Sequence, residues 1–456
     1  MLDSLLIAIA TFFWLSYVPI AILSLYRVVK NRKIFVEKDL RRIQNDPAII
    51  FQITTRSATK TPVVKRGVMS IIESCHQVNF YNHQISVVTD DPNDTRTLKG
   101  SSKCEVVVVD KEFHTNAIKK GRALQYATEH RRPTGRNTSK YWIFHMDDES
   151  YVTTQTILAL LKFIREGRGV ASEGPIFYPL KFESANRLTA LAESVRPYTC
   201  YDCVSQMTNP PPLHMHGSNL LVRSDVEDTI EWKFGPILAE DQMFGFKVYE
   251  KYGPGSMGWH GGILLEQPPL NLKDHFFQRR RWFLGTLQNL EKFPRLHRFK
   301  LMFKSVTYFL GFASAVASAA FTIHNYMPML FSLPAYNISY EEIISLPSRL
   351  PAFSLDSLAQ SAASINPVEF GTAAILLFTS IVWLASYQLG LLLTLRYSKI
   401  GWAKRLVFHV QTLLLCPLIG LVETFPAFWA MIEYQLKKKK SKAEKVPVYD
   451  FYVVSK

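Results

Sequence analysis

An uncharged apolar run at residues 370–395 is the feature of this sequence that most constrains its fold. A helix rises about 1.5 Å per residue, so this run is long enough to cross the roughly 30 Å of hydrocarbon in a bilayer. Residues 5–26 form a similar run, and a third span is expected near 303–325. We therefore expect a multi-pass integral membrane protein.

Basic residues beside these runs predict the orientation. Residues 5–26 are followed by Arg27 and Lys30, whereas a signal peptide has its positive charge in front of the apolar run. By the positive-inside rule, residues 1–27 form a retained transmembrane anchor and the domain that follows, 28–271, is cytosolic.

The last apolar segment, 406–432, fits a simple membrane crossing poorly. Pro417 and Glu423 interrupt it, and both side chains are unfavourable inside a membrane helix. A crossing would also place the basic tail, 437–456, outside, against the charge rule. We therefore favour a broken or re-entrant segment at the end of the membrane region 301–436, and a full crossing is the alternative.

The net charge of +15, from 53 Lys and Arg against 38 Asp and Glu, indicates an anionic partner. Since the sequence contains no zinc-finger or RNA-binding motif, a membrane surface and phosphorylated substrates are favoured and nucleic acid is not. Five cysteines cannot all pair. Most of them lie in segments expected in the cytosol, so no disulfide framework is expected.

Short apolar runs alternate with helical stretches in the cytosolic part. The alternation predicts an α/β fold, with a mostly parallel sheet covered by helices on both faces. The predicted strands are 48–53, 85–89, 105–109, 141–145 and 170–172, and the clearest helices are 117–129 and 155–166. Polar residues follow the first four strands directly, among them Thr55, Arg56, Asp90 and Asp147. Because ligands of open α/β sheets bind beyond the carboxyl ends of the strands, these residues predict a site for a cation and an anionic ligand.

The acidic triplet Asp147, Asp148 and Glu149 follows the fourth predicted strand. Asp147 and Glu149 are two positions apart where the chain turns, so both can reach one hard divalent cation, Mg²⁺ or Mn²⁺, that also binds a diphosphate. The alternative is an acidic cluster at the start of the 155–166 helix.

A second acidic pair, Glu240 and Asp241, lies far downstream. A carboxylate there can take the proton from an acceptor hydroxyl as its oxygen attacks a sugar. The alternative is a surface pair that caps a helix beginning near Gln242.

His216 is expected in a turn with Gly217 and Ser218 that faces the acceptor. His214, His216 and the nearby Cys200 and Cys203 also suggest zinc. The histidine spacing is not the usual three to five residues, so a zinc site is not favoured.

The string Gln278-Arg279-Arg280-Arg281-Trp282 separates the two halves of the chain. On a helix, Gln278, Arg281 and Trp282 share one face, and the opposite face carries Phe276, Phe283, Leu287 and Leu290. We expect residues 272–300 to form an amphipathic helix at the bilayer surface, apolar side toward the lipid. Arg281 ranks first among the arginines for binding a pyrophosphate; an interfacial anchor without chemistry is the alternative.

The order of these strings resembles the membrane-embedded family 2 glycosyltransferases, a group that includes cellulose, chitin and hyaluronan synthases, and in particular the egghead-type β-1,4-mannosyltransferases. The strings that carry the resemblance are 54–56, 88–90, 122–126, 145–149, 239–241, 278–282 and 451–454. The resemblance implies a glycosyltransferase A-type, Rossmann-like fold, a GDP- or UDP-sugar donor, a divalent cation and inversion at the anomeric carbon.

The resemblance also implies residue roles. Asp90 would contact the nucleoside, Asp147 and Glu149 would bind the metal and diphosphate, and Asp241, with Glu240 beside it, would act as the base. The other implied donor-binding residues are Thr55, Arg56, Lys120, Arg122, Asp148, Gln278, Arg281 and Trp282, and the acceptor residues are His216, Gly217, Ser218 and Trp282. Glu149 stands where the family commonly has Asp, and 54–56 departs from the usual first strand end. These departures leave the cation geometry and the base selectivity open.

The favoured function is single transfer of a hexose, such as mannose, to a lipid-linked or glycan hydroxyl at the cytosolic membrane face. Processive polysaccharide synthesis with export is the alternative within this class, but the expected spans are few for a polymer channel. A transporter with a nucleotide-binding regulatory domain is the alternative from another class. It would not explain why Asp241 and the Gln278 string occur together.

Overall fold

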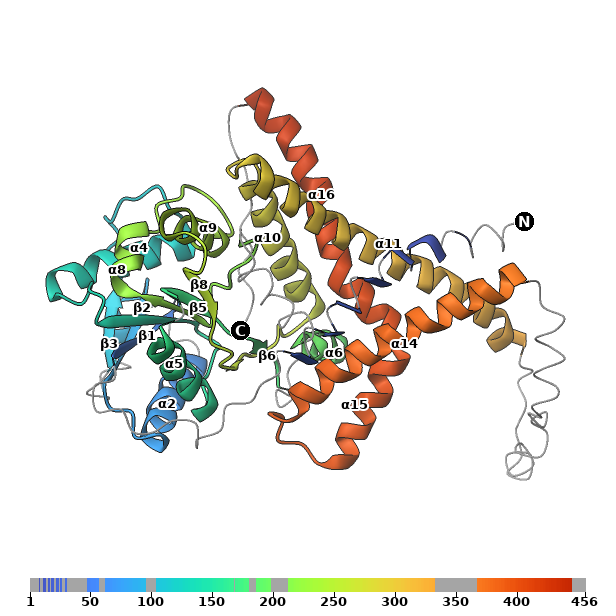
Figure 1. Ribbon diagram of the computed structural model, residues 1–456, viewed down its shortest axis with the longest axis horizontal. Coiled ribbons are helices and arrows are strands. Elements are labelled where there is room, and N and C mark those ends of the chain that lie inside the picture. Colours follow the sequence, from blue (N-terminus) through green and yellow to red (C-terminus); the bar gives the residue numbers. More distant parts are fainter. Residues whose placement is uncertain are drawn as a thin grey trace.

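The computed structural model describes residues 47–56, 62–95, 104–167, 169–179, 186–197, 212–332 and 367–444, with scattered positions between 8 and 30. Within these residues, an α/β part stands beside a group of long helices (Figure 1). Most of the predicted anchor 1–27 lies outside the described residues, as do Cys200, Cys203 and the 451–454 string.

The main sheet has the strand order β3-β2-β1-β4-β7-β5-β8. Its strands are β1 (Ala48–Thr54), β2 (His83–Thr89), β3 (Cys104–Val108), β4 (Tyr141–Asp147), β5 (Ala171–Glu173), β7 (Leu220–Arg223) and β8 (Met257–Trp259). The first four strands run parallel, and β7 pairs antiparallel with both β4 and β5. β6 (Ile176–Phe177) and β9 (Leu264–Leu265) form a small second sheet. The five predicted strands and the mostly parallel α/β fold are therefore confirmed, and β7 is the antiparallel exception.

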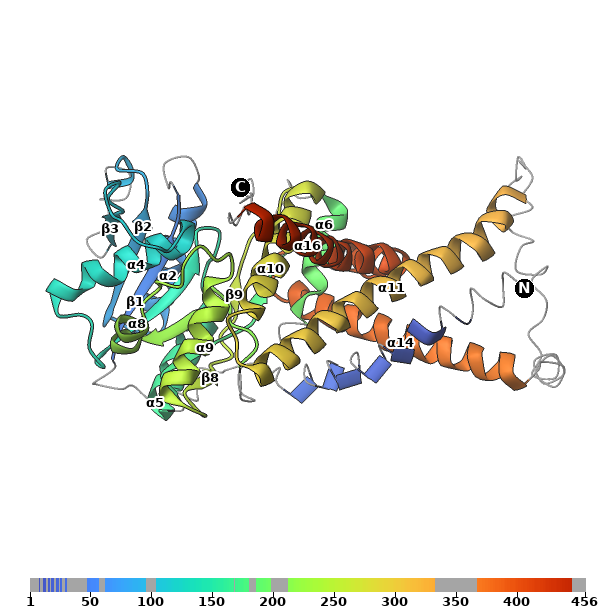
Figure 2. The same cartoon turned by 90° about the horizontal axis from the view of Figure 1, so that it is seen from above.

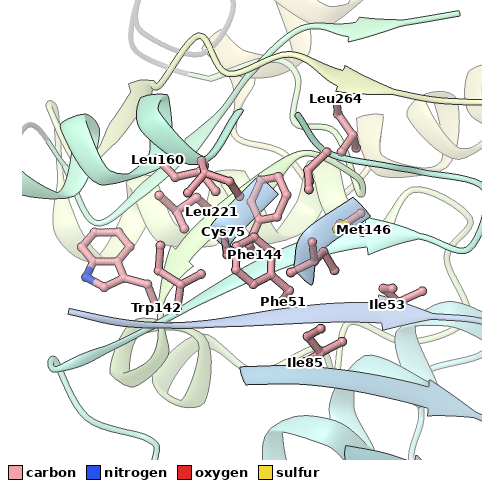
Figure 3. Packing of buried hydrophobic residues seen from close by; sticks show 14 of the residues in the cluster. Phe51, Ile53, Cys75, Ile85, Trp142, Phe144, Met146, Leu160, Leu221 and Leu264 are labelled. Carbon is pink, nitrogen blue, oxygen red and sulfur yellow. The ribbon is translucent and has the colours of Figure 1, made fainter. Parts of the chain in front are cut away.

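Helices cover both faces of the sheet because neighbouring residues of a strand point to opposite sides. Phe51 packs among residues of α2 (Pro62–Gln77) and α5 (Thr154–Glu166), as Figure 3 shows in part. Ile50, one position earlier, packs with residues of three helices on the other face. These are α4 (Lys119–Arg131), which continues into the 3₁₀ turn η2 (Arg132–Thr134), α8 (Ser224–Ile230) and α9 (Glu240–Tyr252).

The parallel arrangement of β1 to β4 brings their carboxyl ends to one edge of the sheet. Thr54 pairs with Asp147 on one side and with Val88 on the other. The polar residues that follow these strands therefore lie along one edge, as predicted.

Long helices follow the α/β part (Figures 1 and 2). They are α10 (Leu272–Leu290), α11 (Arg295–Ser332), α14 (Pro367–Leu395), α15 (Trp402–Leu414) and α16 (Cys416–Glu444), and the shorter α6 (Arg187–Val195) packs among them. The predicted amphipathic helix exists, but it ends at Leu290, and residues 295–300 belong to α11.

The apolar face of α10 packs against protein. Leu287 clusters with Ala430 and Tyr434 of α16, and the rings of Phe276 and Phe425 are 5.6 Å apart. The expectation that this face lies toward lipid therefore differs from the structure, because α16 covers the face. Burial of these side chains stabilises the contact between the two helices.

Among the described residues, one stretch of α16, Cys416–Leu436, is long and apolar enough to cross a membrane, with a mean hydropathy of 1.2. Ser380–Leu395 is a shorter apolar helix. The predicted broken segment at 406–432 consists of α15 and α16, which meet at Leu415, and Pro426 lies inside α16. The multi-pass topology stays a prediction.

Candidate active site

The acidic pair Glu240 and Asp241 forms the first turn of α9, and α10 positions it. Asn289 Nδ2 donates to the carbonyl oxygen of Ala239 at 2.9 Å. Gly285 approaches the same segment so closely that a Cβ added there would lie 2.8 Å from the Cβ of Ala239. α10 thus carries the residues that fix where α9 begins, in addition to the Gln278 string.

Lys120, near the start of α4, joins three segments of the site. Its ammonium donates to a carboxylate oxygen of Asp147, at the end of β4, and to the carbonyl oxygen of Gly217 at 2.9 Å. A Cβ on Gly217 would lie 2.9 Å from Asp241 Oδ2 and 3.2 Å from Lys120 Nζ. The structure therefore brings Lys120, Asp147, Gly217 and Asp241 together from positions far apart in the sequence.

Burial and mutual charge raise the pKa values of the acidic pair. Burial and the neighbouring Asp241 raise the pKa of Glu240 to about 7. Burial also raises the pKa of Asp241, but Lys120, the Gln242 N–H group and Arg281 oppose this effect. The Gln242 N–H group donates to Asp241 Oδ1 at 2.8 Å. The surroundings therefore favour the ionised form of Asp241 more than that of Glu240, and Glu240 keeps a proton up to neutral pH.

The three consecutive arginines of α10 have different surroundings. Arg279 donates to Glu193 of α6, and Arg280 makes a two-point contact with Glu433 of α16. Arg281 acts on the acidic pair of α9, where it lowers both pKa values against the effect of burial. Arg281 is thus the arginine of this string that lies beside the acidic pair, and its role in binding a pyrophosphate stays a prediction.

Glu266 connects the site to Trp282 through a chain of contacts. Ser150 Oγ and the Tyr178 hydroxyl donate to its two carboxylate oxygens at 2.9 and 3.1 Å. Arg196 donates to the Tyr178 hydroxyl at 2.9 Å, and its guanidinium carbon lies 5.1 Å from the centre of the Trp282 ring. Burial, with Asp147 nearby, raises the pKa of Glu266.

The Arg279 guanidinium also lies over the Trp282 ring, 4.4 Å from its centre. Gln278, beside it, accepts a weak hydrogen bond from Arg279 at 3.4 Å. The Trp282 ring is therefore held by two guanidinium groups, Arg196 and Arg279.

The predicted acceptor turn lies at the site. Ser218 Oγ accepts from the Asp147 N–H group at 3.2 Å, and the His216 N–H group donates to Glu173 Oε2 at 2.7 Å. Gly217, between them, is the residue whose carbonyl binds Lys120.

Other predicted donor residues lie along the sheet edge. Thr55 Oγ1 donates to Asp148 Oδ2 at 2.8 Å. Arg122 reaches Asp90 at 3.4 Å, and the Asp90 side chain is 54% exposed. Arg56 is exposed.

Asp147 and Glu149 have separate partners. Asp147 contacts Lys120 of α4, whereas Glu149 is buried and interacts with Arg66 of α2, on the other face of the sheet. The structure therefore joins Asp147 to the site through Lys120 and places Glu149 against Arg66.

Sequence reasoning did not identify Glu173, Glu266, Tyr178 and Arg196. Glu173 ends β5, and Glu266 directly follows β9. Glu173 directly follows the predicted strand 170–172, so extending to this strand the rule that flagged polar residues after the first four strands would have found it. Finding Glu266 would also have required recognition of the two-residue strand β9. Tyr178 and Arg196 had no comparable signal, because only the fold brings them to Trp282.

The chain is similar to known proteins over much of its length. Residues 142–434 match the model of a family described as glycosyl transferase family group 2. The β-1,4-mannosyltransferase egh of Drosophila melanogaster is 27% identical over 248 residues, which are 53% of this chain and 52% of that protein. The β-1,4-mannosyltransferase bre-3 of Caenorhabditis elegans matches with the same identity and the same shares. The chain spans about half the length of the curated relatives it matches.

One solved structure, the mannosyltransferase PcManGT from Pyrobaculum calidifontis in complex with GDP-Man and Mn²⁺, is 14% identical, with a TM-score of 0.45. The match covers 82% of this chain and 98% of that one.

Proposed function

The chain belongs to the glycosyl transferase family group 2, as its sequence predicted, and we propose that it transfers a hexose from a nucleotide-sugar to a hydroxyl acceptor. The observation that carries the proposal is the meeting of Lys120, Asp147, Gly217, Asp241 and Arg281 at one site. The curated relatives are named β-1,4-mannosyltransferases, so GDP-mannose is the first donor to test.

A diphosphate bound at this site would call for a divalent cation. With Glu240 protonated, the carboxylates of Asp147 and Asp241 already balance the positive charges of Lys120 and Arg281. A diphosphate would therefore add net negative charge that a divalent cation can offset. Carboxylate oxygens are the donors that Mg²⁺ and Mn²⁺ prefer, and Asp147 would hold the ion. A bound cation would neutralise charge on the departing diphosphate.

Glu240, Asp241, Lys120 and Arg281 have different roles in the reaction. Asp241 takes the proton from the acceptor hydroxyl, and the freed oxygen attacks the anomeric carbon while the bond to the diphosphate breaks on the opposite side. Lys120 and Arg281 place fixed positive charge where the leaving group gains negative charge. Glu240 keeps its proton and so limits the charge beside the base. The anomeric configuration inverts because one displacement occurs.

A lipid-linked or glycan acceptor at the cytosolic membrane face fits the surroundings of the site. The candidate span in α16 contacts α10, which carries Arg281 and Trp282. Large apolar side chains are exposed on the neighbouring helices, among them Phe303 of α11 and Leu414 of α15, at 63% and 75%. Exposed apolar side chains on helices that pack around α16 are typical of a membrane contact.

The test is a screen of nucleotide-sugars for diphosphate release by the purified full chain, with and without Mn²⁺. We expect GDP-mannose to be used only with a divalent cation. Asp241→Asn should lower kcat by about 10²- to 10⁴-fold while donor binding persists. Asp228→Asn, which removes a surface carboxylate paired with Arg132, is the matched control and should leave kcat unchanged. Normal turnover by Asp241→Asn would refute the assignment of the base.

A further inference from the structure

We propose that Glu173, His214 and His216 bind a second metal ion, a divalent transition metal such as Zn²⁺, separate from the ion held by Asp147. The sequence alone did not favour zinc here, because two histidines two positions apart are an unusual pair. The structure adds a carboxylate from β5 that completes a set of three ligands.

The distances between the three side chains suit one ion. A ligand nitrogen or oxygen atom of each lies within 4.8 Å of those of the other two. His216 Nδ1 is 3.5 Å from Glu173 Oε2, and the two imidazole rings are 4.5 Å apart between centres. Metal–nitrogen bonds of about 2.0–2.1 Å in tetrahedral geometry separate neighbouring ligand atoms by about 3.4 Å. The cluster therefore needs only a small inward movement to close on an ion.

The fold holds these ligands in place. Glu173 is fully buried at the end of β5, where it pairs with Leu220 of β7 and Trp259 of β8. His214 and His216 are separated by Met215, which is buried in the core beneath α9. In an extended segment, residues on either side of an inward-pointing residue share the opposite face, so both imidazoles lie on the side of Glu173.

The chemistry of the donor set indicates which ion would bind. Two imidazole nitrogens and one carboxylate oxygen select Zn²⁺, Co²⁺ or Fe²⁺ over Mg²⁺, which prefers oxygen ligands. Three protein ligands also leave a coordination position for water. The site near Asp147, with its carboxylate oxygens, has the opposite preference.

A second cluster of glutamate and histidine side chains differs because an arginine contacts its carboxylates. Glu193, His275 and Glu423 also lie within 4.8 Å of one another, but Arg279 contacts both carboxylates. The guanidinium supplies the positive charge at that cluster, so it carries no metal proposal.

A metal at Glu173 would fix the turn that enters the active site. His216 directly precedes Gly217, whose carbonyl binds Lys120 and whose Cα lies beside Asp241. Tying His214 and His216 to the sheet would therefore set the position of Gly217 relative to the base.

The experiment measures metal binding rather than sugar transfer, so its outcome is independent of the proposed function. The detergent-purified full chain is stripped with a chelator and titrated with Co²⁺, whose visible absorption reports nitrogen ligation, and Zn²⁺ is then added as the competitor. We expect one Co²⁺ per chain to give this nitrogen-ligand absorption, and we expect Zn²⁺ but not Mg²⁺ to displace it. His214→Gln and Glu173→Gln should each weaken Co²⁺ binding more than tenfold.

Two variants serve as controls. Asp147→Asn should retain Co²⁺ binding, and so should His76→Gln, which removes an exposed histidine of α2. Wild-type protein that binds no Co²⁺ or Zn²⁺ at micromolar concentration would overturn the proposal, as would binding lost in Asp147→Asn and kept in His214→Gln. If the buried Glu173 variant fails to fold, X-ray absorption of the Zn²⁺-loaded wild type can identify the ligands of the ion instead. A Zn²⁺ coordination shell without imidazole ligands would also overturn the proposal.

Discussion

Gly217→Ala is the sharpest test of the geometry around Asp241. The backbone φ of Gly217 is not positive, so alanine is compatible with the chain conformation. The new methyl group, however, would lie 2.9 Å from Asp241 Oδ2 and 3.2 Å from Lys120 Nζ, where ordinary contacts begin at 3.4 Å. Either the carboxylate or the ammonium must therefore move.

The size of that movement sets the expected effect. The carboxylate contact is too short by about 0.5 Å, and a misplacement of about 1 Å can cost 10²-fold in rate. We therefore expect kcat to fall about tenfold, with the folded state kept, because overpacking costs about 1–3 kcal/mol. The assay is initial-rate transfer from the donor found in the screen, at saturating donor and acceptor, beside thermal melts of both proteins.

Gly121→Ala is the matched control on the neighbouring helix α4. A methyl group there would meet Ala117 Cβ at 3.5 Å and Glu240 Cβ at 3.8 Å, which are ordinary contacts. Alanine also has the higher helix propensity, by about 1 kcal/mol. Gly121→Ala should thus keep the wild-type kcat and melt no earlier. If Gly217→Ala turned over as fast as Gly121→Ala, the placement of Gly217 against the base would be refuted.

Three further predictions concern the folded state. The pKa of Glu240, raised from 4.5 to about 7, means that the folded chain binds the extra proton, so the free energy of unfolding falls as pH rises from 4.5 to 7. In thermal melts without donor or cation, Glu240→Gln should therefore lose less stability than the wild type between pH 4.5 and 7. The same pH dependence in both proteins would contradict this prediction. Glu433→Gln leaves the buried guanidinium of Arg280 without its two-point partner and should cost about 3 kcal/mol in denaturant unfolding. Gly285→Ala should lower the melting temperature, because its methyl group would meet the backbone nitrogen of Ala239 at 2.8 Å; a melt at or above wild type would show that the two segments can separate freely.

The α/β part was predictable because its signals are local. The apolar runs at β1, β2 and β4 are bounded by polar turns, and each strand begins or ends within two residues of its prediction. Parallel pairing then requires their carboxyl ends to share an edge, so the positions of Thr55, Asp90 and Asp147 at one edge followed from chain direction alone. The antiparallel strand β7 was not predicted, because four residues are too few to show the alternating pattern that separates a strand from the turns around it.

The surroundings of α10 show where prediction from the sequence reaches its limit. Helical periodicity placed Arg281 and Trp282 on one face, and that placement follows from the helix itself. It could not show that the opposite face packs on α16, since an apolar stripe suits lipid and protein equally well. The separate partners of Arg279 and Arg280 depend on Glu193 and Glu433, which lie 86 and 153 positions away in the chain.

The sequence by itself determined the family, the alternation of strands and helices, and the residue types at the strand ends, because these depend on short-range periodicity and on the order of strings along the chain. Only the tertiary structure decided which carboxylates meet Lys120, which arginine lies beside Asp241, and that Glu173 stands next to His214 and His216. Burial and charge at the site depend on distances between segments far apart in the chain, and such distances exist only once the segments have packed.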